Sequence, residues 1–311
     1  MREVELAYTL TQSNETSAGL DKESIYAALK ADPDAYQKLR QKANLPKAGF
    51  PWETVLDPRI GTEGIENLAQ YQQRAIAYLQ QDIAEACLGN KQGPIKAALD
   101  VLRDIRNEVR QAVQDGAIGD RSFHEELCSF YTPFNSFVSI GPPLYRVEQL
   151  VGAMRAGTVV LLPPDPFISP DTGKHSVTVT GRYFSAEPLS VQAVVESRQP
   201  RVDALGTADE FLQGLLDSGL VGLHRFTDSS SSSGAVAVKP RDFRVLNEHG
   251  NADDRVFLYG VPLEGLQWGT AATIRPFVNS VIFQDANRIA HTMLTERADT
   301  PKSTRNERVQ E

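Results

Sequence analysis

The sequence predicts an α/β protein with a helical subdomain attached. The first part of the chain repeats apolar residues at helical spacing, and the middle part alternates apolar and polar residues as strands do. The last part places a strand, a glycine-containing loop and a helix in succession. We therefore expect a mainly helical subdomain over 1–130, an α/β part over 131–296, and a polar, disordered tail over 297–311.

Composition and charge argue against several classes of function. The net charge of −8 does not suit a nucleic-acid-binding surface, which would need a basic patch. No apolar run approaches the ~20 residues of a membrane-spanning helix, and the N-terminus lacks the apolar core of a signal peptide. Cys87 and Cys128 are interpreted as small core residues of a reducing compartment. We expect a cytoplasmic protein without a nucleic-acid or membrane partner.

Helical periodicity dominates the first half of the chain. Pro94 suits a first helical turn and Gly116 suits the position just past a helix end, so the strongest helix is expected between them. Trp52 follows a proline and is expected to be a packing anchor in a loop. The expected helices span 23–43 (interrupted at Asp32-Pro33), 64–88, 94–115 and 121–130.

The pattern changes near residue 133. A proline-rich loop is expected over 132–143, followed by a helix that ends at Gly157. Three runs of strand-type residues then predict an antiparallel meander, with strands at 158–162, 175–180 and 191–195.

Further short elements precede the C-terminal helix. Thr207 and Glu210 form a capping box for a helix over 208–217, which Gly219 ends. Residues 228–234 are rich in serine and are expected to form a flexible loop. The remaining expected elements are strands at 235–238 and 243–246, a turn at Asn247 and Gly250, a buried strand of the parallel type at 256–260, and a helix from near Pro276 to about 296.

The common phosphate-binding and catalytic motifs are absent from the sequence. No two of the 22 glycines are separated by a single residue, so the dinucleotide fingerprint G-x-G-x-x-G does not occur. His124 and Cys128 could share a helix face and bind a metal, but two ligands are too few, and ordinary helix residues are the favoured interpretation. The serines of 229–233 could hold a nucleophile, yet a linker is favoured. We expect no metal site, and no catalytic residue stands out.

The stretch VFLYGVPLEGLQWGTAATIRPFVNSV (256–281) points to a ligand. In open α/β sheets ligands bind beyond the carboxyl ends of strands, and a helix N-terminus presents free N–H groups and partial positive charge. Small residues such as Gly269 let a flat ligand approach the backbone. Arg275 would add charge, and Asn279 would add a donor and an acceptor. The alternative is a tight connection with a solvated Arg275.

Three stretches of the chain resemble the C-terminal half of a family of FAD/NAD(P)-binding proteins, which groups FAD-dependent urate hydroxylase with aspartate N-monooxygenase-like enzymes. They are DVLRDIRNEVR (100–110), FYTPFNSFVSIGPPLYRVEQLVGAMRAGTVVLL (130–162) and YGVPLEGLQWGTAATIRPFVNSVIFQDANRIA (259–290). The resemblance covers roughly residues 95–295. It implies a partial FAD/NAD(P)-binding, Rossmann-like flavoprotein fold with a helical subdomain and a β-meander, in which 131–296 is the C-terminal part of the FAD/NAD(P)-binding domain.

The resemblance also implies cofactors and site residues. FAD would be the cofactor and NAD(P)H its reductant, and the flavin would activate O2 to hydroxylate a small-molecule substrate. The family pattern has glycine after Arg-Pro, where this chain has Phe277. The residues expected to contact FAD are Gly260, Trp268, Gly269, Thr270, Arg275, Pro276, Asn279 and Ser280.

The missing glycine fingerprint limits what the chain is expected to do alone. That fingerprint would hold the FAD pyrophosphate, so we expect a C-terminal portion of a flavin-dependent monooxygenase. It would be inactive by itself and would work with an N-terminal FAD-binding half supplied in trans. The alternative is a non-catalytic binding or interaction protein that retains the flavoprotein scaffold.

Overall fold

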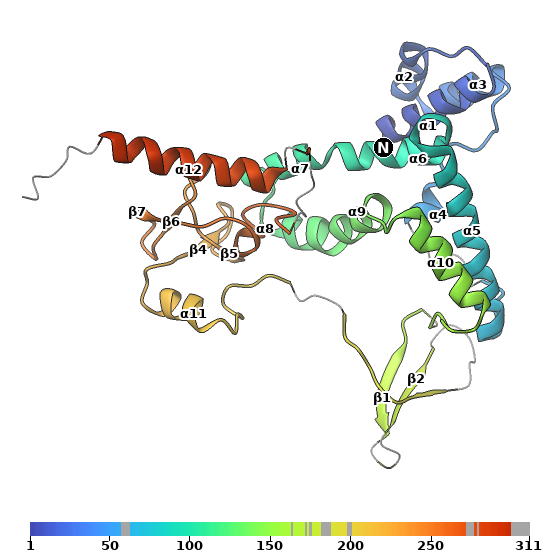
Figure 1. Ribbon diagram of the computed structural model, residues 1–311. Helices are drawn as coiled ribbons and strands as arrows, with labels where there is room; N and C mark the ends of the chain where they lie inside the picture. The colour runs from blue at the N-terminus through green and yellow to red at the C-terminus, as the bar shows by residue number, and fades with distance from the viewer. Residues whose placement is uncertain are drawn as a thin grey trace, which may run out of the picture. The chain divides into compact units, whose positions relative to one another are not determined.

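The computed structural model of the chain divides into two compact units, whose elements are labelled in Figure 1. The structure describes residues 1–56, 63–162, 164–171, 173, 176–181, 188–197, 201–271, 277–278 and 280–299. Unit 1 comprises Met1–Ile105 and Phe130–Arg198, and unit 2 comprises Arg106–Ser129 and Gln199–Glu311. Each unit takes in two stretches of chain, and the domain boundary at residue 130 stays a prediction.

Unit 1 is mainly helical. Its helices are α1 (Arg2–Glu15), α2 (Lys22–Ala31), α3 (Pro33–Lys42), α4 (Trp52–Leu56), α5 (Leu68–Gln92), α6 (Pro94–Asp104), α9 (Thr132–Ser139) and α10 (Leu144–Arg155). Helix α1 packs against α2 and α6, and α5 packs against α6 and α10. Asp32 ends α2 and caps α3 by accepting a hydrogen bond from the Ala35 backbone N–H at 2.7 Å. The interruption expected at Asp32-Pro33 is therefore confirmed.

Three helices of unit 1, namely α1, α4 and α9, were not expected from the sequence. Helix α1 has no apolar stripe at helical spacing, because polar residues such as Thr9 and Ser13 lie on its buried face. Their hydroxyls are satisfied internally, since Thr9 Oγ1 lies 2.5 Å from the Tyr36 hydroxyl and Ser13 Oγ accepts from the Leu20 backbone N–H. Helix α9 replaces most of the loop expected over 132–143, and that expectation is wrong. Its proline lies in the first turn, where a missing N–H costs nothing.

A buried polar network joins α1, α3 and the segment after α3. Arg40 is 0% exposed, and each of its three guanidinium nitrogens has an acceptor. The acceptors, at 2.6–3.3 Å, are Thr9 Oγ1, the Tyr36 hydroxyl, Gln12 Oε1 and the carbonyls of Pro46 and Ala48. Such full pairing is what allows a charged side chain to be buried.

A second set of bonds centres on the Glu5 carboxylate. It accepts hydrogen bonds from the Tyr36 hydroxyl at 2.8 Å and from the Trp52 indole N–H at 2.9 Å. The Trp52 ring also packs edge-on against Phe50, with ring centroids 4.8 Å apart. Trp52 is therefore confirmed as a packing anchor, although it begins α4 and does not lie in a loop.

This network predicts a loss of stability at high pH. Burial is the largest cause that raises the pKa of Tyr36 from 10.0 to about 12, and Glu5 raises it further. The folded state therefore holds the phenolic proton more tightly than the unfolded state, so the stabilisation is complete below pH 10 and disappears between about 10 and 12. We expect the free energy of unfolding to fall by about 1–2 kcal/mol across this window, after allowance for solvent screening.

The measurement is urea unfolding at a series of pH values. Tyr36→Phe should remove this part of the pH dependence, whereas Tyr145→Phe, at an exposed tyrosine of the same unit, should keep it. Equal slopes for the wild type and Tyr36→Phe would contradict the assignment.

The small sheet of unit 1 is an antiparallel meander, but only the strand expected at 175–180 lies where it was predicted, because the strand expected at 191–195 ends at Val191. Its strands are β1 (Phe167–Asp171), β2 (Ser176–Thr180) and β3 (Leu189–Val191), in the order β1-β2-β3. Phe167 pairs with Thr180, and Val177 pairs with Val191. The strand expected at 158–162 is wrong, because that segment forms no ladder. Instead the side chain of Gln72 bonds to both backbone groups of Leu161, at 2.6 and 2.9 Å.

The helix expected over 94–115 is in fact two helices. Helix α6 ends at Asp104 and α7 (Arg106–Gln114) begins after Ile105, where the two compact units also divide. The outer ends agree with expectation, because Pro94 opens α6 and Gly116 follows α7 with a φ of +69°.

Unit 2 combines short helices with two antiparallel hairpins. Its elements are α7, α8 (Asp120–Ser122), the π-helix η2 (Phe123–Tyr131, which runs past the end of the unit), α11 (Glu210–Asp217), β4 (Leu223–Arg225), β5 (Ser232–Val236), β6 (Arg244–Leu246), β7 (Ala252–Phe257), the 3-10 turn η3 (Val261–Leu263) and α12 (Val281–Asp299). Strand β4 pairs with β5, and β6 pairs with β7. Across the ranges that are described in both units, no helix has the length and apolar character needed to cross a bilayer.

Several local expectations for unit 2 are corrected. The buried parallel strand expected at 256–260 is wrong, because β7 is antiparallel, mostly exposed and ends at Phe257. The capping box is also wrong, since Asp209 caps α11 by accepting from the Leu212 backbone N–H at 2.7 Å. The loop expected over 228–234 gives way to β5 at Ser232. Gly219, with a φ of +69°, ends α11 as expected. The Rossmann-like class itself stays a prediction.

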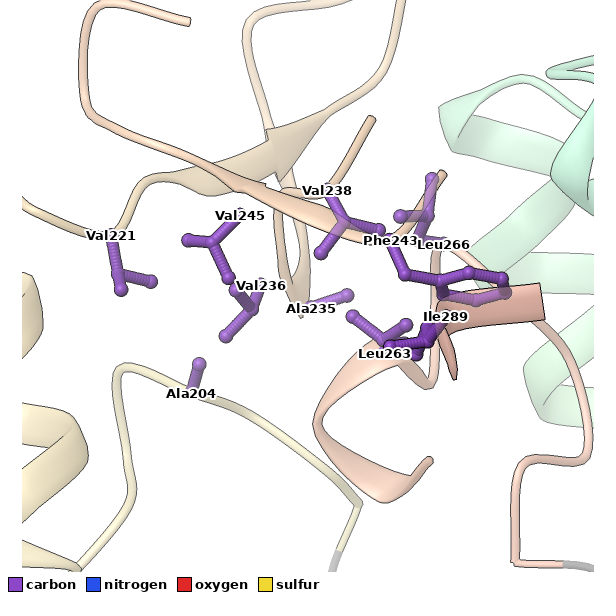
Figure 2. Packing of buried hydrophobic residues seen from close by; sticks show 10 residues of the cluster. All are labelled: Ala204, Val221, Ala235, Val236, Val238, Phe243, Val245, Leu263, Leu266 and Ile289. Carbon is purple, nitrogen blue, oxygen red and sulfur yellow. The ribbon is translucent and has the colours of Figure 1, made fainter. Parts of the chain in front are cut away.

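The core of unit 2 holds the loop that follows β7. Figure 2 shows Leu263 and Leu266 among side chains of the two hairpins, with Ile289 of α12 in the same cluster. Leu263 is 0% exposed, so the chain around Glu264 and Gly265 is anchored on both sides. The ten buried members of the cluster are Ala204, Val221, Ala235, Val236, Val238, Phe243, Val245, Leu263, Leu266 and Ile289.

Gly265 permits this anchoring, and its replacement should be costly. Its φ is +114°, and a Cβ there would lie 2.9 Å from both the carbonyl and the hydroxyl oxygen of Ser233. We expect Gly265→Ala to lower the free energy of unfolding of the chain by about 2–4 kcal/mol, because backbone strain and overlap add. Gly250→Ala is the matched control, since Gly250 has a φ of +78° but no atom within 4 Å of its Cβ. Equal losses in urea unfolding would show that Ser233 does not restrict Gly265.

Candidate functional site

A pocket of unit 2 lies where the sequence predicts a ligand. Its cavity volume is about 50 Å³, within a wider recess of about 460 Å³ that includes open solvent. Four predicted site residues line it, namely Gly260, Trp268, Gly269 and Thr270. The other lining residues are Arg110, Gln114, Gln267, Val281, Ile282 and Asp285. Arg275, Pro276 and Asn279 were also predicted, and they lie outside the described residues.

The Glu264 carboxylate holds the loop of the pocket in shape. It accepts hydrogen bonds from the Gly269 N–H at 2.9 Å, the Thr270 N–H at 2.7 Å and the Thr270 hydroxyl at 2.6 Å. Charge-assisted bonds of this kind are about twice as strong as neutral ones. These two backbone donors are thus engaged within the chain, so Gly269 and Thr270 offer a ligand surface and not free N–H groups.

Arg110 reaches the pocket from α7. Its Nε donates to the Trp268 carbonyl at 3.2 Å, and its Nη1 donates to Asn107 Oδ1 at 2.7 Å. The guanidinium carbon lies 5.8 Å from the centroid of the Trp268 ring, as in a cation–π contact. Its Nη2 lies beside Gly269, 3.5 Å from the position of a Cβ there. Burial lowers the pKa of Arg110, Arg106 adds to this effect, and Glu264 opposes it.

Asp285 brings a buried carboxyl group to the pocket from α12. Its side chain is only 6% exposed, and burial raises its pKa, while Arg288 and a hydrogen bond with Gln267 act in the opposite direction. Sequence reasoning missed this residue. A signal was present, because Asp285 precedes the buried Ile289 by one helical turn and so lies on the same face.

Ser280 contributes an unusual hydroxyl at the start of α12. The helix begins at Val281, later than the start near Pro276 expected from the sequence, and the Gln284 N–H donates to the Ser280 carbonyl at 3.1 Å. A serine at this position ordinarily bonds to a backbone N–H of the first turn. Here Oγ is buried and has no hydrogen-bond partner among the described residues. Ser280 does not line the pocket, but it directly precedes Val281, which does, and a buried unpaired hydroxyl calls for an explanation.

By their chemistry these residues suit a flat, partly apolar ring such as that of a flavin. Trp268, Val281 and Ile282 supply an apolar lining, and Ser280, which does not itself line the pocket, precedes Val281 in the chain. Gly260 has a φ of +86° and nothing within 4 Å of a Cβ, so the backbone is open there. Phe277 does not fill the pocket, because its side chain is fully exposed at 107%. Its φ of +62° is of the kind that favours the glycine of the family pattern.

Outside this pocket the structure pairs two residues that sequence reasoning left apart. His224 Nδ1 lies 2.9 Å from Ser233 Oγ, although no histidine partner was indicated for the serines of 229–233. Ser233 is buried beneath Gly265, so its hydroxyl is closed to a substrate. His124 lies 3.3 Å from Asp120, and the described residues form no group of three metal-ligating side chains around it or elsewhere.

The cysteines do not both lie in a core. Cys128 is partly buried, but Cys87 is exposed, so the expectation for Cys87 is wrong. Both are free thiols in the structure. Helix α5 carries Cys87 on a face that no neighbouring element covers completely, a property that spacing within one helix cannot reveal.

Comparison with known proteins places the homologues of this chain among monooxygenases. L-aspartate N-monooxygenase of Streptomyces davaonensis is 41% identical over 223 residues, which is 70% of this chain and 34% of the relative. Nitrosuccinic acid synthase of Aspergillus oryzae is 38% identical over 220 residues, 71% of this chain and 33% of the relative. L-aspartate N-monooxygenase of Streptomyces cremeus is 34% identical over 301 residues, 94% of this chain and 45% of the relative. No family model matches the chain.

The chain spans between about a third and a half of the length of these curated relatives. The homologues are named as monooxygenases, which is consistent with the coarser expectation of an oxidoreductase.

Proposed function

We propose that this chain supplies part of the active site of a flavin-dependent N-monooxygenase, whose substrate is a small amino acid such as L-aspartate. The observation that carries the proposal is the pocket around Trp268, which lies in the stretch predicted to contact FAD. The names of the homologues support the reaction class and the substrate. The alignment with the Streptomyces cremeus enzyme includes 94% of this chain, so it extends over nearly all of both units.

The residues of the pocket have separate tasks in this proposal. Trp268, Val281 and Ile282 would exclude water from the ring, and the hydroxyl of Ser280, the residue before Val281, would donate a hydrogen bond to it. The first turn of α12 favours negative charge on the reduced ring. When bound, FAD reduced by NAD(P)H activates O2 and oxidises the substrate amine. Arg275, Pro276 and Asn279 complete the set of residues predicted to contact the ring. The FAD phosphates would be bound by a separate polypeptide, an N-terminal FAD-binding half that acts in trans.

The proposal predicts an unusual pattern of flavin affinity. If the chain binds only the ring, riboflavin and FAD should bind it with similar affinity, because the nucleotide part of FAD gains no contact. Addition of a polypeptide that carries the G-x-G-x-x-G half of a homologue should then raise the affinity for FAD alone. Flavin fluorescence titration measures both. Absence of flavin binding in both experiments would overturn the proposal and favour the alternative, a non-catalytic interaction protein.

Ser280→Ala provides a second prediction. It removes the unpaired hydroxyl, so we expect riboflavin affinity to fall about five- to tenfold while the free energy of unfolding stays the same or rises slightly. Thr292→Ala is the matched control on α12, where the hydroxyl already donates to the Arg288 carbonyl at 3.0 Å. This control should keep the wild-type affinity. A loss of stability in Ser280→Ala, with affinity unchanged, would assign the hydroxyl a structural role.

A further inference from the structure

Two oppositely charged side chains line the pocket without pairing with each other. Arg110 comes from α7 and Asp285 from α12. The neighbouring charges that shift the pKa of Arg110 are those of Arg106 and Glu264. The neighbouring charge that shifts the pKa of Asp285 is that of Arg288. Among the described residues no salt bridge joins Arg110 to a carboxylate. The pocket therefore presents a positive and a negative group at separate places on its wall.

Arg110 is held in a fixed orientation with one edge available. Its Nε and Nη1 are bonded to the Trp268 carbonyl and to Asn107, and Nη2 lies beside Gly269 without a hydrogen-bond partner in the part of the chain that the structure describes. A guanidinium group suits a carboxylate because its planar donors match the two oxygens. An arginine that is already ordered loses little side-chain entropy when it binds.

Asp285 is similarly placed for a cation. Its carboxyl group is nearly fully buried and is held by Gln267. An ionised carboxylate accepts hydrogen bonds only, so its natural ligand partner is an N–H group with positive charge. Burial is the largest cause of the pKa shift of both side chains, because it disfavours their charged forms. An opposite charge on a ligand would offset this cost of desolvation.

We propose that Arg110 and Asp285 form the two ends of a site for a zwitterionic amino acid, with Arg110 binding a carboxylate and Asp285 binding the ammonium group. The assignment rests on the proposed function for its substrate class. Binding itself does not need the flavin, so the two proposals can fail separately. The nitrogen held at Asp285 would be the one that is oxidised, after the ammonium group has given up a proton to leave a neutral amine.

The test is calorimetric titration of the full chain with two probes, L-aspartate and succinate, with and without riboflavin. Succinate lacks the ammonium group but keeps the carboxylates. Arg110→Gln should lower the affinity for both probes by about 30-fold or more. Asp285→Asn should weaken L-aspartate by at least about tenfold but leave succinate unchanged or tighter. The matched controls are Arg121→Gln and Asp253→Asn, which change the same charges at surface ion pairs of unit 2.

A merely structural role predicts a different pattern. If Asp285→Asn weakens both probes equally, or if Arg110→Gln affects neither, the assignment is wrong. Failure of the wild type to bind L-aspartate in both conditions would also overturn it. Binding of L-aspartate without binding of riboflavin would leave this site in place and reject the flavin proposal instead.

Discussion

Replacement of Arg40 by methionine is expected to lower the free energy of unfolding by about 3–5 kcal/mol. Arg40 is the largest fully buried side chain in the described part of the chain. Methionine fills much of the same volume, but it cannot donate to the oxygens that the guanidinium satisfies. The carbonyls of Pro46 and Ala48 would then be buried without their present donor, at a cost of about 1–3 kcal/mol each.

Urea unfolding followed by circular dichroism measures this loss, with Arg103→Met as the matched control. The Arg103 side chain is 48% exposed and pairs with Asp100 on the surface of α6 in the same unit. Its removal should change the free energy of unfolding by less than about 1 kcal/mol. If the two variants lose the same amount, the network around Arg40 does not contribute as described.

Glu264→Ala is expected to lower the free energy of unfolding by about 2–4 kcal/mol. The variant removes three hydrogen bonds at once and leaves the Gly269 and Thr270 N–H groups without an acceptor. Because Gly269 and Thr270 line the pocket, ligand affinity should fall as well. Glu264→Gln should cause an intermediate loss of stability. Its amide oxygen can still accept hydrogen bonds, but the amide nitrogen that replaces the second carboxylate oxygen cannot.

Hydrogen exchange of the two backbone amides tests this mechanism directly. In Glu264→Ala the amides of Gly269 and Thr270 should lose protection, whereas amides of the hairpins should change less. The control is Glu248→Ala, at an exposed carboxylate that lies 3.5 Å from His249 Nε2 on the surface of unit 2. Unchanged protection in Glu264→Ala would mean that other contacts hold the loop.

Capping and helix-breaking residues in the sequence predicted where helices end more reliably than apolar spacing predicted which segments are helical. Asp32-Pro33, Pro94, Gly116 and Gly219 act through their own backbone and side chains, so a sequence pattern is enough to place them. Helix α1 depends on partners that are distant in sequence, because Thr9 is satisfied by residues of α3. Spacing of apolar residues cannot detect a helix face that is buried through polar contacts.

The strand-type segments failed for a related reason. TVVLL (158–162) has the composition of a buried strand, but a strand needs a neighbouring strand. The hydrogen-bond partners that the structure gives these residues are the Gln72 side chain and the Ala153 carbonyl. The run at 256–260 is apolar because Phe257 and Leu258 pack against the core of unit 2. Composition alone cannot separate that packing from a parallel sheet.

In the candidate site, too, residues close together in the sequence could be predicted, whereas a residue distant in the sequence could not. Gly260, Trp268, Gly269 and Thr270 lie within one short stretch, so the sequence could bring them together. Arg110 joins them across 158 positions of sequence, and only the fold reveals that contact.

The most direct test of the central claim, that this pocket binds a flavin ring, uses the chain's own fluorescence. The chain has two tryptophans, so Trp52→Phe leaves Trp268 as the single reporter inside the pocket. Titration with riboflavin should quench its emission with saturation, and adding Ser280→Ala should shift the curve to higher concentration. Emission that falls only linearly with added riboflavin, or a curve that Ser280→Ala leaves in place, would contradict the account.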